Sequence, residues 1–215
     1  MKNLSLKYFA FVFVTLTLLI GWLLALYNGI DTSSFMNFIT LVPNIVTVEL
    51  LLFGIFVGWG WKWRIFRGWL VPFPDLNGTW VGAIQSNWVN PETNKTIAPI
   101  PAMLTIKQNF LNISCVMHTG EMKSYSFSEE FRIDKERQTQ TLSYSYSSKP
   151  RSMFRKRSAQ HDGSAILDII TSPDLKLSGK YWTERETTGE IQLSFHCKEL
   201  LQEITGDLGS HPLHK

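Results

Sequence analysis

The chain has 215 residues, which is enough for one ordinary domain and a membrane segment. Its formal net charge is +3 at pH 7. Residues 8–61 contain no lysine or arginine, whereas residues 68–215 carry sixteen basic and sixteen acidic residues. The positive excess therefore lies beside the apolar segments at the start of the chain, which argues against binding to DNA or RNA polymers. Two cysteines, Cys115 and Cys197, are too few for a disulfide scaffold. Both fall in phase with apolar neighbours on predicted strands, so we expect buried thiols.

The first predicted element is an apolar helix over residues 8–27. These twenty residues carry no charge, and about 20 residues are needed to cross the hydrocarbon core of a bilayer. A cleaved secretory signal peptide is the competing interpretation, because Lys2 and Lys7 precede the apolar run. The run is too long for that, no convincing cleavage site follows, and a second apolar segment comes next. We therefore expect a membrane-spanning helix.

A second predicted span covers residues 38–59, with Pro43 in its first turns, after a short polar loop over residues 28–37. Cations lie before the first span and after the second, and none lies in the loop. By the positive-inside rule, both chain termini face the cytoplasm. Tryptophans and cations mix directly after the second span, as in an interfacial belt. We expect residues 1–71 to form a two-helix transmembrane hairpin.

Two features of the second span suggest a role in assembly. Gly54 and Gly58 form a GxxxG pattern, which lets helix backbones approach closely, although such pairs are also common by chance. Glu49 lies mid-span, where an ionised carboxylate is costly and tends to face a partner or water. It either hydrogen-bonds within the hairpin as a protonated acid or makes a polar contact when hairpins assemble. Glu49, Gly54 and Gly58 are the candidate membrane-assembly residues.

The chain beyond Pro72 and Pro74 is rich in strand patterns. Eight segments have strand character and are separated by turn signals: residues 78–87, 102–108, 111–118, 124–133, 139–147, 164–170, 175–183 and 189–197. Short connections favour antiparallel neighbours in sequence order. The predicted fold class is all-β: a compact eight-stranded antiparallel β-barrel over residues 72–198, preceded by the hairpin and followed by a tail over residues 199–215. Such a barrel is either packed with side chains or holds one small ligand.

Period-two alternation predicts which face of a strand lies inside. Along the segment 124–133, Tyr125, Phe127, Phe131 and Ile133 are predicted to share the apolar face, with serines and Arg132 on the other. One apolar and one polar face per strand is the pattern that a barrel or sandwich requires.

Enzyme signatures are absent from the sequence. It contains no GxSxG elbow, HExxH motif or phosphate-binding loop. Glu129 and Glu130 are adjacent, hence on opposite faces of a strand, and cannot act as a catalytic carboxylate pair. We expect no catalytic residue, no metal site and no cofactor.

A basic loop and two tyrosines are candidate ligand contacts. Residues 148–157 carry five cations, Arg151 among them, and no acid. If the loop lies at a barrel mouth, its cations neutralise the phosphates of a ligand. The alternative is a loop that is solvated or that contacts anionic lipid headgroups. Tyr144 and Tyr146 offer stacking surface for bases, or else they fill the core.

The segment 179–189 is the second candidate. It combines the aromatic ring of Tyr181 with the guanidinium of Arg185 and the hydroxyls of Thr183 and Thr187. Aromatic rings stack on bases, and arginine and hydroxyl groups bind phosphates. Its tyrosine is equally compatible with core packing.

The whole pattern resembles a known family. Two N-terminal apolar helices precede Pro-Asp-Leu-Asn-Gly-Thr-Trp-x-Gly at 74–82, His-Asp-Gly at 161–163 and Gly-Lys-Tyr-Trp-Thr-x-Arg-x-Thr-Thr-Gly at 179–189. This resembles the transmembrane β-barrel effectors of bacterial anti-phage cyclic-oligonucleotide signalling (CBASS), over nearly the full length. The resemblance implies that a cognate nucleotidyltransferase makes a cyclic dinucleotide, which the barrel binds. It further implies that the effector then forms homo-oligomers and disrupts the inner membrane, killing the infected cell by abortive infection.

The family motif does not map each ligand contact. The candidate ligand-binding residues therefore rest on residue chemistry: Tyr144, Tyr146, Arg151, Tyr181, Thr183, Arg185 and Thr187. Two further interpretations stay open. A glycine and a tryptophan opening an eight-stranded barrel are also typical of lipocalin-like carriers, which suggests a membrane-tethered binder of a small apolar ligand. A purely structural membrane adaptor with a filled barrel is the other.

Overall fold

The computed structural model describes residues 4–30, 35–90, 93–155, 158–171 and 173–203. The predicted tail over 199–215 falls mostly outside these residues. The chain divides into two compact units, one containing Leu4–Pro74 with Asn109–Leu111, the other containing Asp75–Gln108 and the chain from Asn112 onward. Each unit is considered by itself below.

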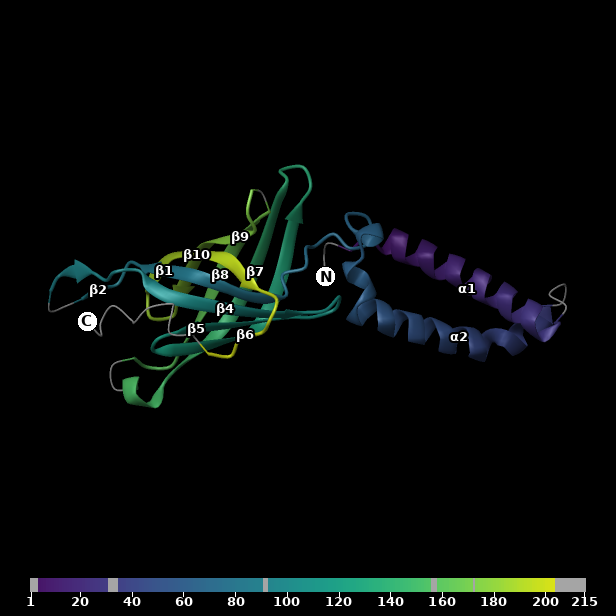
Figure 1. Ribbon diagram of the computed structural model, residues 1–215, viewed down its shortest axis with the longest axis horizontal. Helices are drawn as coiled ribbons and strands as arrows, with labels where there is room; N and C mark the ends of the chain where they lie inside the picture. The colour runs from purple at the N-terminus through teal and green to yellow at the C-terminus, as the bar shows by residue number, and fades with distance from the viewer. Residues whose placement is uncertain (1–3, 31–34, 91–92, 156–157, 172, 204–215) are drawn as a thin grey trace. The chain divides into compact units, whose positions relative to one another are not determined.

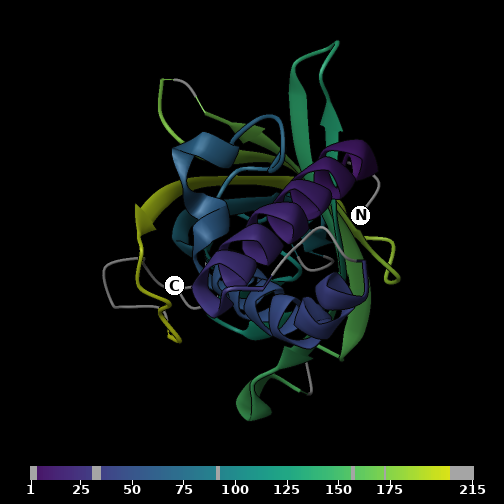
Figure 2. The same cartoon turned by 90° about the vertical axis from the view of Figure 1, so that its right-hand side faces the viewer.

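Two long helices, α1 (Leu6–Asn28) and α2 (Phe35–Gly58), lie side by side as an antiparallel pair (Figures 1 and 2). Both are long and apolar enough to cross a membrane. Helix α1 ends at Gly29, whose φ of 64° places it in the left-handed region and whose N–H bonds the carbonyls of Ala25 and Leu26. The two helices touch through a small apolar cluster, while most of their large apolar side chains are exposed. Large exposed apolar surfaces of this kind are typical of sites that contact a membrane or another protein.

Two 3₁₀ turns, η1 (Gly60–Lys62) and η2 (Arg64–Phe66), follow α2 in the same unit. Trp61 is buried there with Val71 and Phe110. The ring of Phe110 lies 4.9 Å from that of Phe56, centroid to centroid, in an edge-on arrangement. Aromatic residues therefore pack together directly after the second apolar helix.

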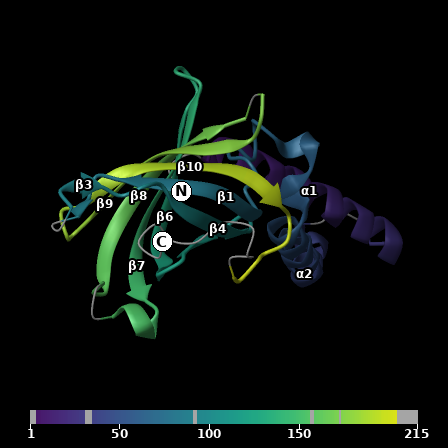
Figure 3. The same ribbon diagram turned by 60° about the vertical axis from the view of Figure 1, so that its left-hand side comes forward.

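The second unit is a closed antiparallel barrel with strand order β1-β10-β9-β8-β7-β6-β5-β4 (Figures 1 and 3). The predicted fold class is confirmed. The eight strands are β1 Gly78–Ser86, β4 Ile100–Gln108, β5 Ile113–Thr119, β6 Met122–Asp134, β7 Thr139–Pro150, β8 His161–Ile170, β9 Lys176–Thr183 and β10 Thr188–Cys197. A small hairpin of β2 (Val89–Asn90) and β3 (Lys95–Thr96) was not predicted, since two-residue strands show no alternation.

One part of the barrel interior is packed with side chains. Trp80 is fully buried among residues such as Leu104, Leu142 and Leu167, and its Nε1–H donates to the Leu76 carbonyl at 3.0 Å. Gly82 shows how closely the strands approach, because a Cβ there would lie 2.0 Å from the carbonyl oxygen of Gln192.

The expectation for the cysteines is half correct. Cys115 is 1% exposed inside the barrel, whereas Cys197 ends β10 and is only partly buried. Both are free thiols.

The predicted apolar face of β6 is wrong in the first part of the strand and correct at Phe131. Tyr125 and Phe127 are 43% and 63% exposed, whereas Phe131 packs against the barrel core. The register with β7 shifts between Ser126 and Ser128, so Phe127 is an extra residue in a β-bulge. A one-residue insertion reverses the inside and outside faces, and the alternation pattern assumed an uninterrupted strand.

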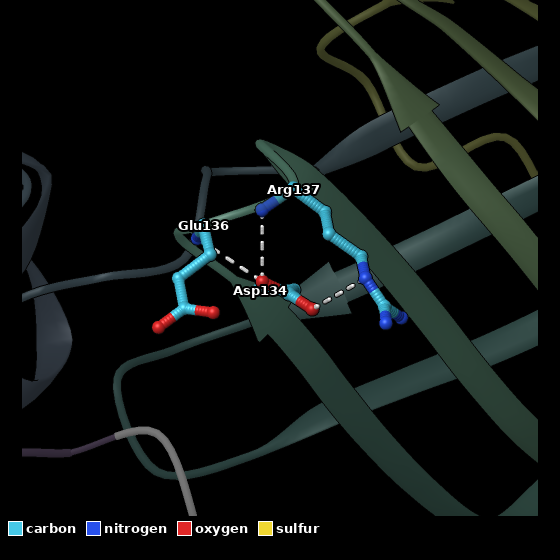
Figure 4. Close-up of polar contacts among 3 residues, drawn as sticks. All are labelled: Asp134, Glu136 and Arg137. Carbon is cyan, nitrogen blue, oxygen red and sulfur yellow. Dashed lines mark hydrogen bonds and ion pairs between the residues drawn. The ribbon is translucent and has the colours of Figure 1, made fainter.

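The turn between β6 and β7 is closed by Asp134 (Figure 4). One carboxylate oxygen, Oδ1, accepts hydrogen bonds from the backbone N–H groups of Glu136 and Arg137, each at 3.0 Å. The other, Oδ2, lies 3.8 Å from Nε of Arg137. An aspartate that accepts hydrogen bonds from the turn that follows it stabilises that turn.

Candidate ligand-binding site

The barrel contains a cavity of about 420 Å³. Its volume falls within the range of small-molecule sites. Six of the seven predicted ligand-binding residues border it: Tyr144, Tyr146, Tyr181, Thr183, Arg185 and Thr187. They come from β7, from β9 and from the turn between β9 and β10, so segments about 40 residues apart in sequence converge on one space.

Strand β7 supplies two of the tyrosines. Tyr144 and Tyr146 are two residues apart, so both point to the same side of the strand. Their ring centroids are 5.9 Å apart, at an angle of 48°. Both rings border the cavity and also belong to the barrel core, so each ring packs against core side chains and lines the cavity as well. Burial raises the pKa of both phenols, which stay neutral at pH 7.

The turn from Thr183 to Thr187 closes on itself by hydrogen bonds. The two threonine hydroxyls are 2.7 Å apart, and the Thr183 N–H donates to the Thr187 carbonyl at 3.0 Å. Glu186 has a φ of 60°, which the tight turn requires. This turn presents Arg185, whose Nη1 donates to the Ser158 hydroxyl and to the Ala159 carbonyl, both at 3.4 Å. These two contacts orient the guanidinium at the cavity rim. A guanidinium has five N–H donors, so others remain available to bind a ligand.

Arg151 is placed differently. Its side chain is exposed and does not border the cavity, and its backbone N–H donates to the Glu121 carbonyl at 2.9 Å. It precedes a short 3₁₀ turn, η3 (Ser152–Phe154). Lys156 and Arg157, two further cations of the predicted basic loop, lie outside the described residues. A ligand contact through Arg151 stays a prediction.

Several polar residues of the cavity were not predicted. The Ser124 and Ser148 hydroxyls share a buried hydrogen bond of 2.9 Å, and His161 Nδ1 lies 3.1 Å from the Ala159 carbonyl. Burial lowers the pKa of His161, so its ring is neutral at pH 7. With Nδ1–H donating, Nε2 is left as an acceptor. Serines at alternate positions of β6 and β7 were the available signal, and the reversed face of β6 concealed it.

The helical unit holds the three candidate membrane-assembly residues. Thr17 of α1 donates its hydroxyl proton to Glu49 Oε1 of α2 at 2.6 Å. Gly54 lies five positions along α2, about 140° around the helix from Glu49, and Gly58 follows one turn later. A Cβ added at either glycine would meet no described neighbour within 4 Å. Glu49 therefore faces α1, while the two glycines lie on an open face.

Comparison with known proteins agrees with this architecture. A family model described as Cap15, cyclic dinucleotide receptor domain, matches residues 71–194, more than half of the chain. The chain belongs to the Cap15 cyclic dinucleotide receptor family. CD-NTase-associated protein 15 from Staphylococcus schleiferi is 26% identical over 157 residues, which cover 73% of this chain and 80% of that relative. The resemblance to CBASS effectors is thus confirmed, and the Cap15 match contains all six predicted residues that border the cavity.

Proposed function

We propose that this chain is a membrane-anchored effector of cyclic-oligonucleotide anti-phage signalling, whose barrel cavity binds a cyclic dinucleotide. One observation carries the proposal. A cavity bordered by neutral tyrosines and by Arg185 lies within the stretch that matches a cyclic dinucleotide receptor domain.

The lining suits both chemical parts of a cyclic dinucleotide. Tyrosine rings such as Tyr146 and Tyr181 give the bases an aromatic surface on which to stack. Arg185 at the rim offers a charged, forked donor for a phosphate, and the Thr187 hydroxyl adds a neutral one. The neutral Nε2 of His161 accepts a hydrogen bond from a base amino group. The barrel acts as a receptor and performs no catalysis.

The two apolar helices anchor the receptor in the bacterial inner membrane. Each is long enough to span the hydrocarbon core, and the cations lie at the start of α1 and after α2, with none in the loop between the helices. The positive-inside rule then places both termini in the cytoplasm, where a cognate nucleotidyltransferase releases its product. The anchor therefore keeps the barrel in the compartment that contains its ligand.

Ligand binding drives the effector into homo-oligomers. A ligand changes an assembly equilibrium only by binding one state more tightly, so the cavity binds ligand best in the assembled form. In the membrane, the open face at Gly54 and Gly58 lets α2 pack closely against α2 of another copy. Glu49, bonded to Thr17 in a single hairpin, becomes a polar group within the cluster of helices. Clustering disrupts the inner membrane and ends in abortive infection.

The test is a calorimetric titration of the full chain in lipid nanodiscs with a panel of cyclic dinucleotides. Tyr181→Ala should abolish or strongly weaken saturable binding. Trp182→Ala is the matched control, because this neighbour on β9 is an exposed aromatic that does not border the cavity. The same samples in dye-loaded vesicles report ligand-dependent leakage.

Binding without leakage would remove the membrane-disruption step alone. No binding by any member of the panel to a folded chain would overturn the receptor proposal. Saturable binding of a fatty acid that is unchanged in an Arg185→Ala variant would favour the lipocalin-like carrier. A barrel that binds neither a cyclic dinucleotide nor a fatty acid would favour the adaptor.

A further inference from the structure

A row of aromatic rings lies at one end of the helical unit, on the two 3₁₀ turns. Successive ring centroids are 5.1 to 6.3 Å apart, in the order Trp59, Trp63, Phe66, Trp69 and Tyr8. The row joins the residues that follow α2 to the start of α1 (Figure 1). Its three tryptophans are exposed. Tryptophan and tyrosine are enriched where the hydrocarbon core of a bilayer meets its headgroups.

Hydrogen bonds hold the backbone that carries this row. The N–H groups of Leu70 and Val71 both donate to the Phe66 carbonyl, at 3.2 and 2.8 Å. The Trp69 Nε1–H donates to the Ile65 carbonyl at 2.5 Å. The residues after α2 therefore present their side chains from a defined loop rather than from an extended linker.

Two arginines are exposed on the same loop. Arg64 and Arg67 are three residues apart, and the Arg67 N–H donates to the Arg64 carbonyl at 3.2 Å. Neither guanidinium forms an ion pair with another described residue. The one acid in the described part of the helical unit is Glu49, which is bonded to Thr17 between the helices. The positive charge on the loop is therefore available to an anion from outside this unit.

The position of the arginines identifies the anion. Helix α2 is apolar and exposed along most of its length, and the first cations after it lie on the loop. Arg64 and Arg67 thus lie where an apolar span meets water, and the anions at that boundary are lipid phosphates. A guanidinium donates two parallel hydrogen bonds to a phosphate. Each cation near an anionic membrane surface favours that surface by about fivefold.

We propose that Arg64 and Arg67 bind the headgroup phosphate of an anionic phospholipid such as phosphatidylglycerol, while the aromatic row fixes their depth at the membrane surface. A zwitterionic headgroup also has a phosphate, but its positive amine repels the arginines, so the site prefers a lipid with net negative charge. The site is separate from the barrel cavity. It rests on the membrane anchoring proposed above and is independent of cyclic dinucleotide binding.

Quenching of tryptophan fluorescence by brominated lipids tests the site. The full chain with Trp22→Phe is reconstituted in phosphatidylcholine vesicles, because this substitution leaves the helical unit with tryptophans only within residues 59–69. Brominated phosphatidylglycerol or brominated phosphatidylcholine is added in separate series, and the two quenching curves give the relative affinity of the lipids. Phosphatidylglycerol should be preferred by about tenfold or more, and the preference should fall at least about fivefold in Arg64→Gln with Arg67→Gln.

Two further variants distinguish a defined site from general attraction. Arg132→Gln with Lys180→Gln is the matched control, because it removes two exposed cations from the barrel and none from the helical unit. This control should keep the full preference. Arg64→Lys with Arg67→Lys retains both charges and should keep most of it. An equal loss in the barrel control, or an equal loss in the lysine and glutamine variants, would overturn the proposal.

Insertion is measured on the same vesicles by extraction with alkaline carbonate. A chain that carbonate removes from the vesicles would overturn the anchoring on which the site rests. An inserted chain with equal affinity for the two lipids would overturn the lipid site alone and leave the anchor and the receptor proposal standing.

Discussion

Arg185 and Arg151 were both predicted to bind phosphate, and the structure separates them. Arg185 borders the cavity and is oriented by Ser158 and Ala159, whereas Arg151 is exposed and does not border it. Arg185→Ala should therefore weaken binding of a cyclic dinucleotide, and Arg151→Ala should leave it nearly unchanged. The two variants remove the same charge from one barrel, so each controls for the other.

The size of the effect follows from the kind of contact. A hydrogen bond to a charged group contributes about 1.5–3 kcal/mol, and about 1.4 kcal/mol is tenfold in Kd. Because Arg185 is itself an exposed residue at the rim, the lower part of this range applies. We expect Kd to rise about 10- to 30-fold for Arg185→Ala and by less than about threefold for Arg151→Ala, since a distant exposed charge is screened by salt. The Kd of Arg185→Lys should lie between those of the parent chain and Arg185→Ala, because lysine keeps the positive charge but cannot donate two parallel hydrogen bonds to a phosphate.

Calorimetry on the full chain in nanodiscs measures these values at two salt concentrations. The affinity of the parent chain should fall with rising salt, and that salt dependence should be smaller in Arg185→Ala. Circular dichroism confirms that each variant keeps its strand content. A greater loss of affinity for Arg151→Ala than for Arg185→Ala would refute the placement of the phosphates at this rim.

Three further predictions concern other parts of the chain. Burial lowers the pKa of His118 to about 4, so the unfolded chain takes up this proton near pH 6.5 and the folded chain only near pH 4. Stability should fall by at most about 3 kcal/mol between pH 6.5 and 4, and urea unfolding of His118→Gln should show most of that pH dependence removed. Trp80→Ala should lower the unfolding free energy by about 3–5 kcal/mol, measured by chemical denaturation, because Trp80 is fully buried in the barrel. Gly54→Leu combined with Gly58→Leu should preserve helix content, since both positions are open, yet reduce ligand-dependent leakage of vesicles.

The main features of the fold were predictable from the sequence, because hydrophobic length and alternation follow directly from burial. An uncharged run such as 8–27 matches the thickness of a bilayer, and α1 covers it with a few residues to spare. All eight barrel strands were predicted, with ends that moved by up to three residues. The bulge at Phe127 was not, because a bulge is set by pairing with β7, and a single strand's pattern does not contain its partner's register.

The candidate site was predictable to the extent that it lies on regular strands. Tyr144 and Tyr146 lie two residues apart on β7, so they share a face of the strand regardless of how the other strands pack. The loop residue Arg151 was not predictable in the same way, since the direction of a side chain outside a ladder depends on tertiary contacts such as the bond to Glu121. Ser124 was missed because the alternation along β6 put its serines on the outer face, and His161 was missed because a lone histidine on a strand carries no distinctive spacing.

The cavity and the bulge in β6 are connected by one strand. Tyr146 of β7 borders the cavity, and its backbone pairs with Ser126, while the neighbouring Ser145 pairs with Ser128. The bulge in β6 thus lies opposite Tyr146, which borders the cavity. Packed strands move between discrete arrangements rather than bending continuously, so a ligand that repositions the ring of Tyr146 acts on the strand pair that carries the bulge. Tyr146→Ala should accordingly weaken binding of a cyclic dinucleotide, measured by calorimetry on the full chain in nanodiscs. Trp182→Ala should leave that binding nearly unchanged, because Trp182 is exposed on β9 and does not border the cavity.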